Sequence, residues 1–208
     1  MSIALKTPRT VVRRPYTVLT EAEIGALLAA AETPRNTALL AVLVGAGLRV
    51  SEAVGLDVDD LLEDHEGGAA LYVRQGKGRK DRTVPIHPDV TALLREYLAI
   101  TGRLAGRHAG PLFRRHDRAS KRMVNRGRLT ARAVVDVVHG CAARAGIRGK
   151  QVSPHTLRHT FALRSLRGSG EVVQVSKLLG HTALSTTQRY VDHLETRELR
   201  EAVPLLPT

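Results

Sequence analysis

Apolar residues recur with helical spacing over most of the chain. Thr20 and Glu23 have the spacing of a capping box, so a helix is predicted to begin there and to end before Pro34. The next run, Thr37–Val44, is apolar on every side and predicts a buried helix. Further helices are predicted at Val50–Val54, at about Asp89–Ala99, after Thr130, from Ser153-Pro154 to about Leu166, at Glu171–Leu179, after Ser185 and from about Glu195.

Two short runs have the pattern of β-strands. Residues 69–74 and 82–86 flank the polar, glycine-containing segment Gln75–Asp81, which is typical of a β-hairpin. The fold class is therefore predicted to be α+β, mainly helical, with a small antiparallel β-sheet. A length of 208 residues suits about one domain, and residues 1–18 are expected to form a basic arm or linker before it.

Charge is divided unevenly between the two halves of the chain. Residues 1–100 carry 12 basic and 13 acidic side chains, whereas residues 101–208 carry 20 and 7. A positive field of this kind favours a polyanionic partner. Because only 3% of the residues are aromatic, a surface that stacks unpaired bases is disfavoured, and we expect double-stranded DNA as the partner. The segment Arg114–Arg132, with eight Arg or Lys and one Asp, fits either a solvated loop or a DNA contact.

The sequence argues against a membrane protein and against a secreted one. It has no apolar run long enough to span a bilayer and no signal peptide. Cys141 is the single cysteine, which excludes a disulfide framework and a cysteine-rich zinc module. We therefore expect a cytoplasmic protein without a membrane partner.

Polar residues that an ordinary core would not need occur first around the apolar helix and the hairpin. Arg49 directly follows the apolar helix, where a guanidinium needs a carboxylate or a phosphate. Glu52 lies one turn further on, and for this motif alone a purely structural Arg49–Glu52 ion pair is the favoured interpretation. Lys77 lies between two glycines in the predicted hairpin, but the spacing is not that of a nucleotide-binding loop.

A second group of such residues lies in the later helices. His155 and Arg158 share one face near the N-terminus of a predicted helix. His155 and His159 have the spacing of two zinc ligands, but Thr156 occupies the place of the required Glu, and Arg158 would repel a metal ion. No metal site is therefore expected. Tyr190 alone would be interpreted as a packing residue or as a surface phenol with its hydrogen bonds satisfied.

The order of these motifs resembles that of the tyrosine recombinases, the phage integrase family, and is close to that of Xer-type members. The resemblance covers about residues 16–195 and is carried by GAGLRVSEAVGL, by a lysine in a β-hairpin, by HTLRHTF, by LLGH and by TTQRYVDH. It implies that residues 19–208 form the catalytic domain, without the N-terminal DNA-clamping domain that family members usually carry. The site residues that it implies are Arg49, Lys77, His155, Arg158, His181 and Tyr190, with Glu52 in a supporting position.

The resemblance implies that duplex DNA is broken and rejoined through a 3′-phosphotyrosine on Tyr190, with no cofactor, metal or nucleotide. A phenol with a pKa near 10 is about 0.1% ionised at neutral pH, so loss of its proton costs roughly 4 kcal/mol. His155 is the candidate that assists this loss. Arg49 and Arg158 would hold the phosphate oxygens, because guanidinium groups bind phosphate bidentately and stay charged.

Two further roles are implied by the same resemblance. His181 would donate a hydrogen bond to a non-bridging phosphate oxygen. Lys77, on a hairpin that could reach the scissile bond, would protonate the leaving 5′-oxygen, which is a poor leaving group without a proton.

Two other functions and several partners stay open. A nicking-closing enzyme like the type IB topoisomerases would use the same chemistry, and a DNA-binding regulator that cannot cut would need none of it. The resemblance implies a homotetramer on DNA, and we expect a monomer without DNA. The segment Glu195–Leu206 fits docking on its own domain or on a neighbouring subunit. Accessory recombination proteins are compatible further partners, and integration, excision, resolution and inversion are not distinguished.

Overall fold

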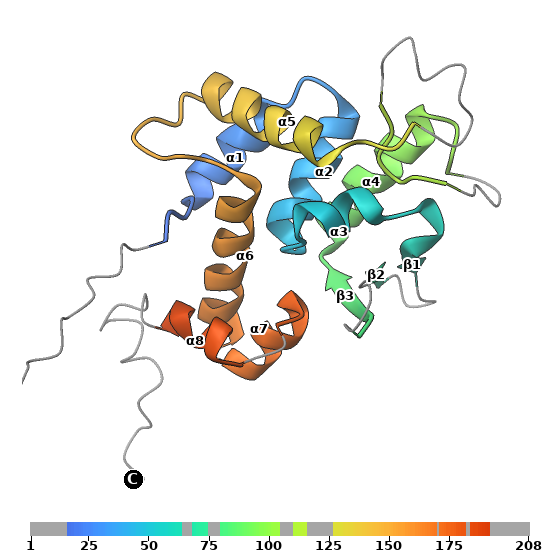
Figure 1. Cartoon of the computed structure of the whole chain (residues 1–208). Helices are drawn as coiled ribbons and strands as arrows, with labels where there is room; N and C mark the ends of the chain where they lie inside the picture. Colours follow the sequence, from blue (N-terminus) through green and yellow to red (C-terminus); the bar gives the residue numbers. More distant parts are fainter. Residues whose placement is uncertain are drawn as a thin grey trace, which may run out of the picture.

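Helices pack beside a small antiparallel sheet in the computed structural model of the chain (Figure 1), which describes residues 16–63, 68–74, 80–104, 110–115, 127–169, 171–181 and 184–191. The predicted α+β, mainly helical fold class is confirmed. The elements are α1 (Glu21–Ala29), α2 (Pro34–Gly45), α3 (Val50–Gly55), the 3-10 turn η1 (Val58–Asp60), β1 (Leu61–Glu63), β2 (Ala69–Val73), β3 (Arg82–Ile86), α4 (Pro88–Ile100), α5 (Ala131–Arg144), α6 (Pro154–Ser169), α7 (Val172–Leu179) and α8 (Leu184–Val191).

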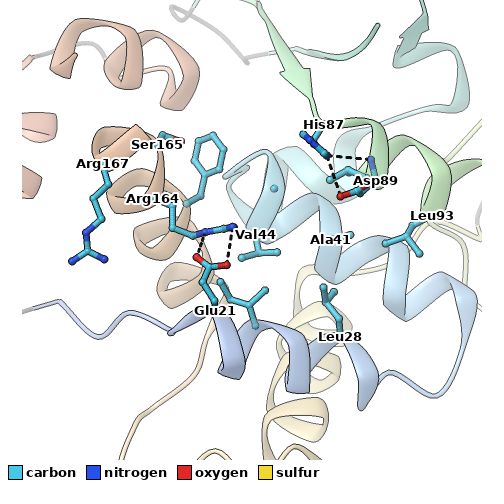
Figure 2. A pocket seen from close by; sticks show the side chains of 14 residues that line it. Glu21, Leu28, Ala41, Val44, His87, Asp89, Leu93, Arg164, Ser165 and Arg167 are labelled. Carbon is cyan, nitrogen blue, oxygen red and sulfur yellow. Dashed lines mark hydrogen bonds and ion pairs between the residues drawn. The ribbon is translucent and has the colours of Figure 1, made fainter. Parts of the chain in front are cut away.

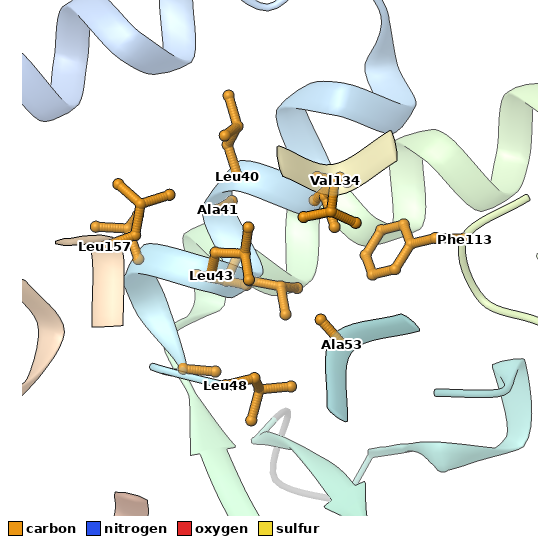
Figure 3. Close-up of a cluster of buried hydrophobic side chains, with 14 of the residues drawn as sticks. Leu40, Ala41, Leu43, Leu48, Ala53, Phe113, Val134 and Leu157 are labelled. Carbon is orange, nitrogen blue, oxygen red and sulfur yellow. The ribbon is translucent and has the colours of Figure 1, made fainter. Parts of the chain in front are cut away.

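Helix α2 forms the centre of the hydrophobic core. Its residues 38–44 are all buried, and it packs against α1, α3, α4 and α6. Figure 3 shows Leu40 and Leu43 of this helix among apolar side chains from other elements, including Phe113 and Leu157. The prediction of a helix that is buried on every side is confirmed, because neighbours cover the whole of its circumference.

The helix starts follow local capping rules. Thr20 N donates to a Glu23 carboxylate oxygen at 2.7 Å and Glu23 N donates to Thr20 Oγ1 at 3.2 Å, which is the predicted capping box. Helix α2 starts earlier than predicted, at Pro34, because Thr33 caps it and the first helical residue needs no N–H donor. Helix α8 likewise includes Ser185 within its first turn instead of starting after it.

The three strands form an antiparallel sheet in the order β1-β2-β3. Leu71 pairs with Val84 in the register of β2 and β3, which confirms the predicted hairpin. Strand β1 was not predicted, because its three residues continue an acidic stretch and show no alternation of their own. Lys77, within the hairpin connection, lies outside the described residues, as do residues 1–15, 116–126 and 192–208.

The described end of the predicted arm lies against the body of the protein. Leu19 N donates to Thr160 Oγ1 at 3.0 Å, and Lys150 Nζ donates to the Val18 carbonyl at 3.1 Å. Leu19 is therefore held on α6, and Val18 is held on the segment before that helix. None of the helices in the described ranges combines the length and the apolar character needed to cross a membrane.

A pocket of about 620 Å³ opens between α1, α2, α4 and α6 (Figure 2). Apolar side chains such as Leu28, Val44 and Leu93 line it. Arg164 Nε donates to Glu21 Oε1 at 2.7 Å and so links α6 to α1 beside the pocket. The lining includes none of the predicted site residues that the structure describes.

Candidate active site

Glu52 is the common partner of three arginines that come from distant parts of the sequence. Arg49 Nη1 donates to Glu52 Oε1 at 2.8 Å, and the Arg49 backbone N donates to Oε2 at 2.8 Å. Arg82 donates to both carboxylate oxygens, at 3.0 and 2.9 Å. Arg158 Nη1 lies 3.8 Å from Oε2. Burial alone would raise the pKa of Glu52, but the hydrogen bonds from Arg82 and Arg49 outweigh it and lower that pKa to about 2.

The three guanidinium groups differ in exposure. The side chains of Arg82 and Arg158 are 9% and 6% exposed, whereas that of Arg49 is 27% exposed. Among the described residues, all three arginines form their ion pair with the same carboxylate, Glu52. Three positive charges therefore lie around one negative charge. The cluster can therefore attract an anion, and Arg49 offers the most accessible contact.

The Arg158 side chain is oriented by the main chain. Its Nη1 donates to the Gly47 carbonyl at 2.6 Å and its Nη2 to the Leu179 carbonyl at 2.7 Å. A guanidinium has five N–H donors, so these two bonds leave donors for a ligand. Burial and the nearby charge of Arg49 lower the pKa of Arg158 to about 10, which keeps it protonated at neutral pH.

Gly47 provides the first of these carbonyls in a conformation that requires glycine. Its φ is +60°, in the left-handed region. A Cβ atom added here would overlap the Phe161 ring. The short link between α2 and α3 can therefore approach α6 closely enough to bind Arg158.

His181 is held in place by the helix that comes after it. Its Nδ1 lies 2.7 Å from Oγ1 of Thr187, which is fully buried in α8. Burial and the positive charges of Arg158 and Arg49 lower the pKa of His181 to about 4. The imidazole is consequently neutral at pH 7, and a neutral imidazole can donate one hydrogen bond to an anion.

Tyr190 is a buried phenol, 5% exposed, on α8. Its hydroxyl lies 2.8 Å from Nδ1 of His159. Burial raises the pKa of Tyr190, while the positive charges of Arg158 and Arg49 act in the opposite direction. The hydroxyl thus lies in the field of the same arginines that can attract an anion.

The structure brings together four of the six predicted site residues. Arg49 and Arg158 share Glu52, and the charges of both act on His181 and Tyr190. His155 is exposed in the first turn of α6, and its ring centroid lies 6.4 Å from that of His159. Lys77 lies outside the described residues.

Two residues of this cluster were missed by sequence reasoning. Arg82 shares the inward face of β3 with Val84 and Ile86, so the alternation of the strand contained the signal of a charge that needs a buried partner. His159 was considered only as a zinc ligand, although its position one turn after His155 places both on one helix face. Among the residues that the structure describes, no three His, Cys, Asp or Glu side chains cluster as a metal site requires.

Comparisons with known proteins extend this picture. Tyrosine recombinase XerC of Pelobacter propionicus (strain DSM 2379 / NBRC 103807 / OttBd1) is 38% identical over 207 residues, which cover 95% of this chain and 61% of that protein. Tyrosine recombinase XerD of Brucella suis biovar 1 (strain 1330) is 40% identical over 164 residues, which cover 78% of this chain and 50% of that protein. The chain thus spans between half and two thirds of the length of these relatives.

Solved structures agree in fold. The crystal structure of XerA recombinase has a TM-score of 0.73 and 31% identity, covering 91% of this chain and 65% of that one. XerH site-specific recombinase, bound to a palindromic difH substrate in a post-cleavage complex, has a TM-score of 0.71 and 26% identity, covering 89% of this chain and 52% of that one. The sequence model described as the Phage integrase family matches residues 17–197. The chain belongs to the phage integrase family, and its similar proteins are Xer-type tyrosine recombinases.

Proposed function

We propose that the chain is the catalytic part of a site-specific recombinase that breaks and rejoins duplex DNA through a 3′-phosphotyrosyl link on Tyr190. The observation that carries this proposal is the buried Tyr190 phenol in the field of Arg158 and Arg49, which share one carboxylate. The names of the relatives and the complex of XerH with its difH substrate support it.

In the proposed reaction the Tyr190 oxygen attacks the phosphorus. A bond from the phenol oxygen to phosphorus forms, and the bond from phosphorus to the 5′-oxygen breaks. The phenol loses a proton and the 5′-oxygen gains one, so the number of phosphate esters is unchanged. Rejoining is the reverse reaction and needs no ATP.

Arg49, Arg158 and His181 are proposed to stabilise the negative charge that grows on the non-bridging oxygens. In phosphoryl transfer, positioning and electrostatics provide most of the rate. Arg158, held by two carbonyls, would be in place before DNA binds, and the more exposed Arg49 would meet the phosphate first. His181, neutral at pH 7, would add one hydrogen bond.

Two further residues complete the proposed reaction. Lys77 is proposed to protonate the leaving 5′-oxygen. His155 is proposed to assist the reaction from the exposed first turn of α6, where the positive end of the helix also favours an anion.

Double-stranded DNA is the proposed partner, with a homotetramer on DNA and a monomer without it. Phosphate contacts would dominate binding, so affinity should fall steeply as salt increases. Accessory recombination proteins, docking by the segment Glu195–Leu206 and a cytoplasmic location also belong to this proposal.

A nicked suicide duplex tests the chemistry. Because the short strand beyond the scissile phosphate diffuses away, a covalent adduct should accumulate and be visible by gel and by peptide mass at Tyr190. Tyr190→Phe should abolish the adduct while duplex binding stays within a few fold. Tyr72→Phe, which removes a hydroxyl bonded to Asp81 at 2.8 Å, is the matched control and should keep the adduct. The absence of an adduct in the unaltered protein would contradict the proposal and favour the regulator.

The second candidate, a topoisomerase-like enzyme, shares the adduct and differs in the fate of the cleaved strand. It would relax a supercoiled plasmid as a monomer and would not exchange strands between two duplexes. The hairpin lysine and the LLGH segment favour recombination. Plasmid relaxation measured beside strand exchange separates the two.

A further inference from the structure

The hydroxyl of Tyr190 contacts His159, a histidine that is not among the six predicted site residues. The distance from the Tyr190 oxygen to His159 Nδ1 is 2.8 Å, and the two rings are tilted by 55° with centroids 5.7 Å apart. His159 belongs to α6 and Tyr190 to α8, so this contact joins two helices across the site.

Tyr16 completes an aromatic cluster, which we define as Tyr16, His159 and Tyr190. The Tyr16 ring stacks on His159 with centroids 4.3 Å apart and a tilt of 27°. It also lies 5.4 Å from the Tyr190 ring. Rotation of a histidine ring about its last torsion is soft, so a stacked neighbour helps to fix the direction of Nδ1. Tyr16 provides that neighbour.

We propose that His159 directs the attacking oxygen of Tyr190 and receives its proton, and that Tyr16 is a positioning residue that holds the His159 ring. This inference rests on the proposed function. In the step, the phenol O–H bond breaks, an N–H bond forms at Nδ1, and the phenol oxygen bonds to phosphorus as the bond to the 5′-oxygen breaks. This proton transfer requires a neutral His159 whose ring proton is on Nε2. On rejoining, His159 returns the proton to Tyr190.

The surroundings of the phenol explain why a direct partner is needed. Burial of Tyr190 opposes its ionisation, and the charges of Arg158 and Arg49 offset only part of this effect. A base must lie within hydrogen-bond reach of the proton that it takes. His159 meets this requirement, whereas His155 is exposed one turn earlier and reaches the cluster through its ring contact with His159. His155 would then act on the phosphate or through His159.

The test compares His159→Gln with His155→Gln in single-turnover cleavage of the nicked suicide duplex between pH 5.5 and 9, values chosen around the ordinary pKa of histidine, about 6.5. Glutamine can still accept a hydrogen bond but cannot take a proton. His159→Gln should slow adduct formation on the order of a hundredfold near neutral pH and remove the acidic limb of the pH profile. The His155→Gln variant should retain the acidic limb, even where its cleavage rate is lower.

Tyr16 is tested by a pair of variants and by a second measurement. Tyr16→Phe keeps the ring and should leave the pH profile unchanged, whereas Tyr16→Leu should slow cleavage and shift the profile in the direction of His159→Gln. With ¹³C-labelled tyrosine, the Tyr190 ring carbon that bears the oxygen should change its chemical shift in His159→Gln and Tyr16→Leu. A melting temperature recorded for each variant separates these effects from loss of the fold.

The outcomes distinguish the inference from the proposed function. If the unaltered protein forms no adduct, the proposed function fails and the inference fails with it. If the unaltered protein forms the adduct and His159→Gln matches it in rate and pH profile, the inference alone is overturned. Loss of the acidic limb in His155→Gln but not in His159→Gln would assign the proton to His155 and would also overturn it.

Discussion

Arg82 and Glu52 form a bidentate ion pair that joins the sheet to the helical part of the site. Arg82 Nη1 and Nη2 donate to the two Glu52 oxygens at 3.0 and 2.9 Å, and Arg82 Nε donates to the Leu178 carbonyl at 2.9 Å. One side chain on β3 thus fixes α3 and α7 relative to the second strand of the hairpin. The carboxylate that holds Arg49 is positioned by this link.

Arg82→Met should destabilise the protein, because it leaves a buried carboxylate without its strongest partner. We expect a loss of about 3 kcal/mol in the free energy of unfolding, or roughly 6 to 12 °C in Tm. Arg95→Met is the matched control, since Arg95 and Glu63 are also bidentate but exposed. It should leave Tm almost unchanged. Equal shifts in the two variants, measured by thermal unfolding, would contradict a special role of the buried pair.

Acid should destabilise the protein in two windows. The pKa of His181 is lowered to about 4 and that of Glu52 to about 2, so the unfolded chain binds more protons than the native one and stability rises with pH. The free energy of unfolding should be greatest above about pH 6.5. It should decrease from there towards pH 4 as His181 becomes protonated, and from about pH 4.5 to 2 as Glu52 becomes protonated. The Glu52 contribution is on the order of 2 kcal/mol.

Urea unfolding at several pH values measures both windows. His181→Gln should flatten the curve between pH 6.5 and 4, and Glu52→Gln should flatten it below pH 4.5, values set by the ordinary pKa of each residue, about 6.5 and 4.3. A free energy of unfolding that stays constant from pH 7 to 3 would contradict the assignment.

Gly47→Ala should impair both stability and the site. The added Cβ would meet the Phe161 ring, and φ of +60° is unfavourable for alanine. We expect a loss of about 2 kcal/mol and slower cleavage, because the Gly47 carbonyl binds Arg158. Gly25→Ala, in α1 with no atom within 4 Å of the new Cβ, should instead stabilise the protein slightly. Tm and single-turnover cleavage measured on both variants decide this.

Arg158→Lys should reduce the cleavage rate although it preserves the charge. A lysine cannot bridge the Gly47 and Leu179 carbonyls and still present a planar fork to phosphate. The loss should be on the order of a hundredfold, equivalent to about 3 kcal/mol of transition-state stabilisation. Arg167→Lys, at the exposed end of α6, serves as the control for the substitution itself. A rate within a few fold of the unaltered protein would show that Arg158 acts only through its charge.

Lys77→Ala tests the proposed general acid. A substrate whose 5′ leaving group is a thiol needs no proton, so it should restore cleavage by this variant. The rates with oxygen and sulfur leaving groups are compared by adduct formation. Failure of the thiol to rescue would assign the proton to another residue.

Local sequence signals predicted most of the helices and the hairpin. Thr20 with Glu23, Thr130 and Ser153-Pro154 act through contacts within one helical turn, so they are visible in the sequence itself. Strand β1 was missed because it depends on pairing with β2. The start of α2 was also missed, although Thr33 before Pro34 is a local capping signal of the same kind as Ser153-Pro154.

The site residues also fall into those that sequence motifs predicted and those that depend on contacts between distant segments. Motif order identified the residues that now cluster, including Arg49 and Arg158. It did not show that Arg82 shares Glu52 with them or that Tyr16 stacks on His159, because these contacts join segments far apart in the sequence. Only the packing of β3, α6 and the chain before α1 creates them.

The two hydrogen bonds from Arg158 to main-chain carbonyls have a consequence for protein synthesis. Its two carbonyls come from the link after α2 and from the end of α7, and the arginine itself lies between them in the sequence. During synthesis, Arg49 is therefore translated long before the Leu179 carbonyl that helps to orient Arg158. The ribosome must translate the chain through α7 before Arg158 can bind both carbonyls, so unfinished polypeptides cannot hold Arg158 in this orientation.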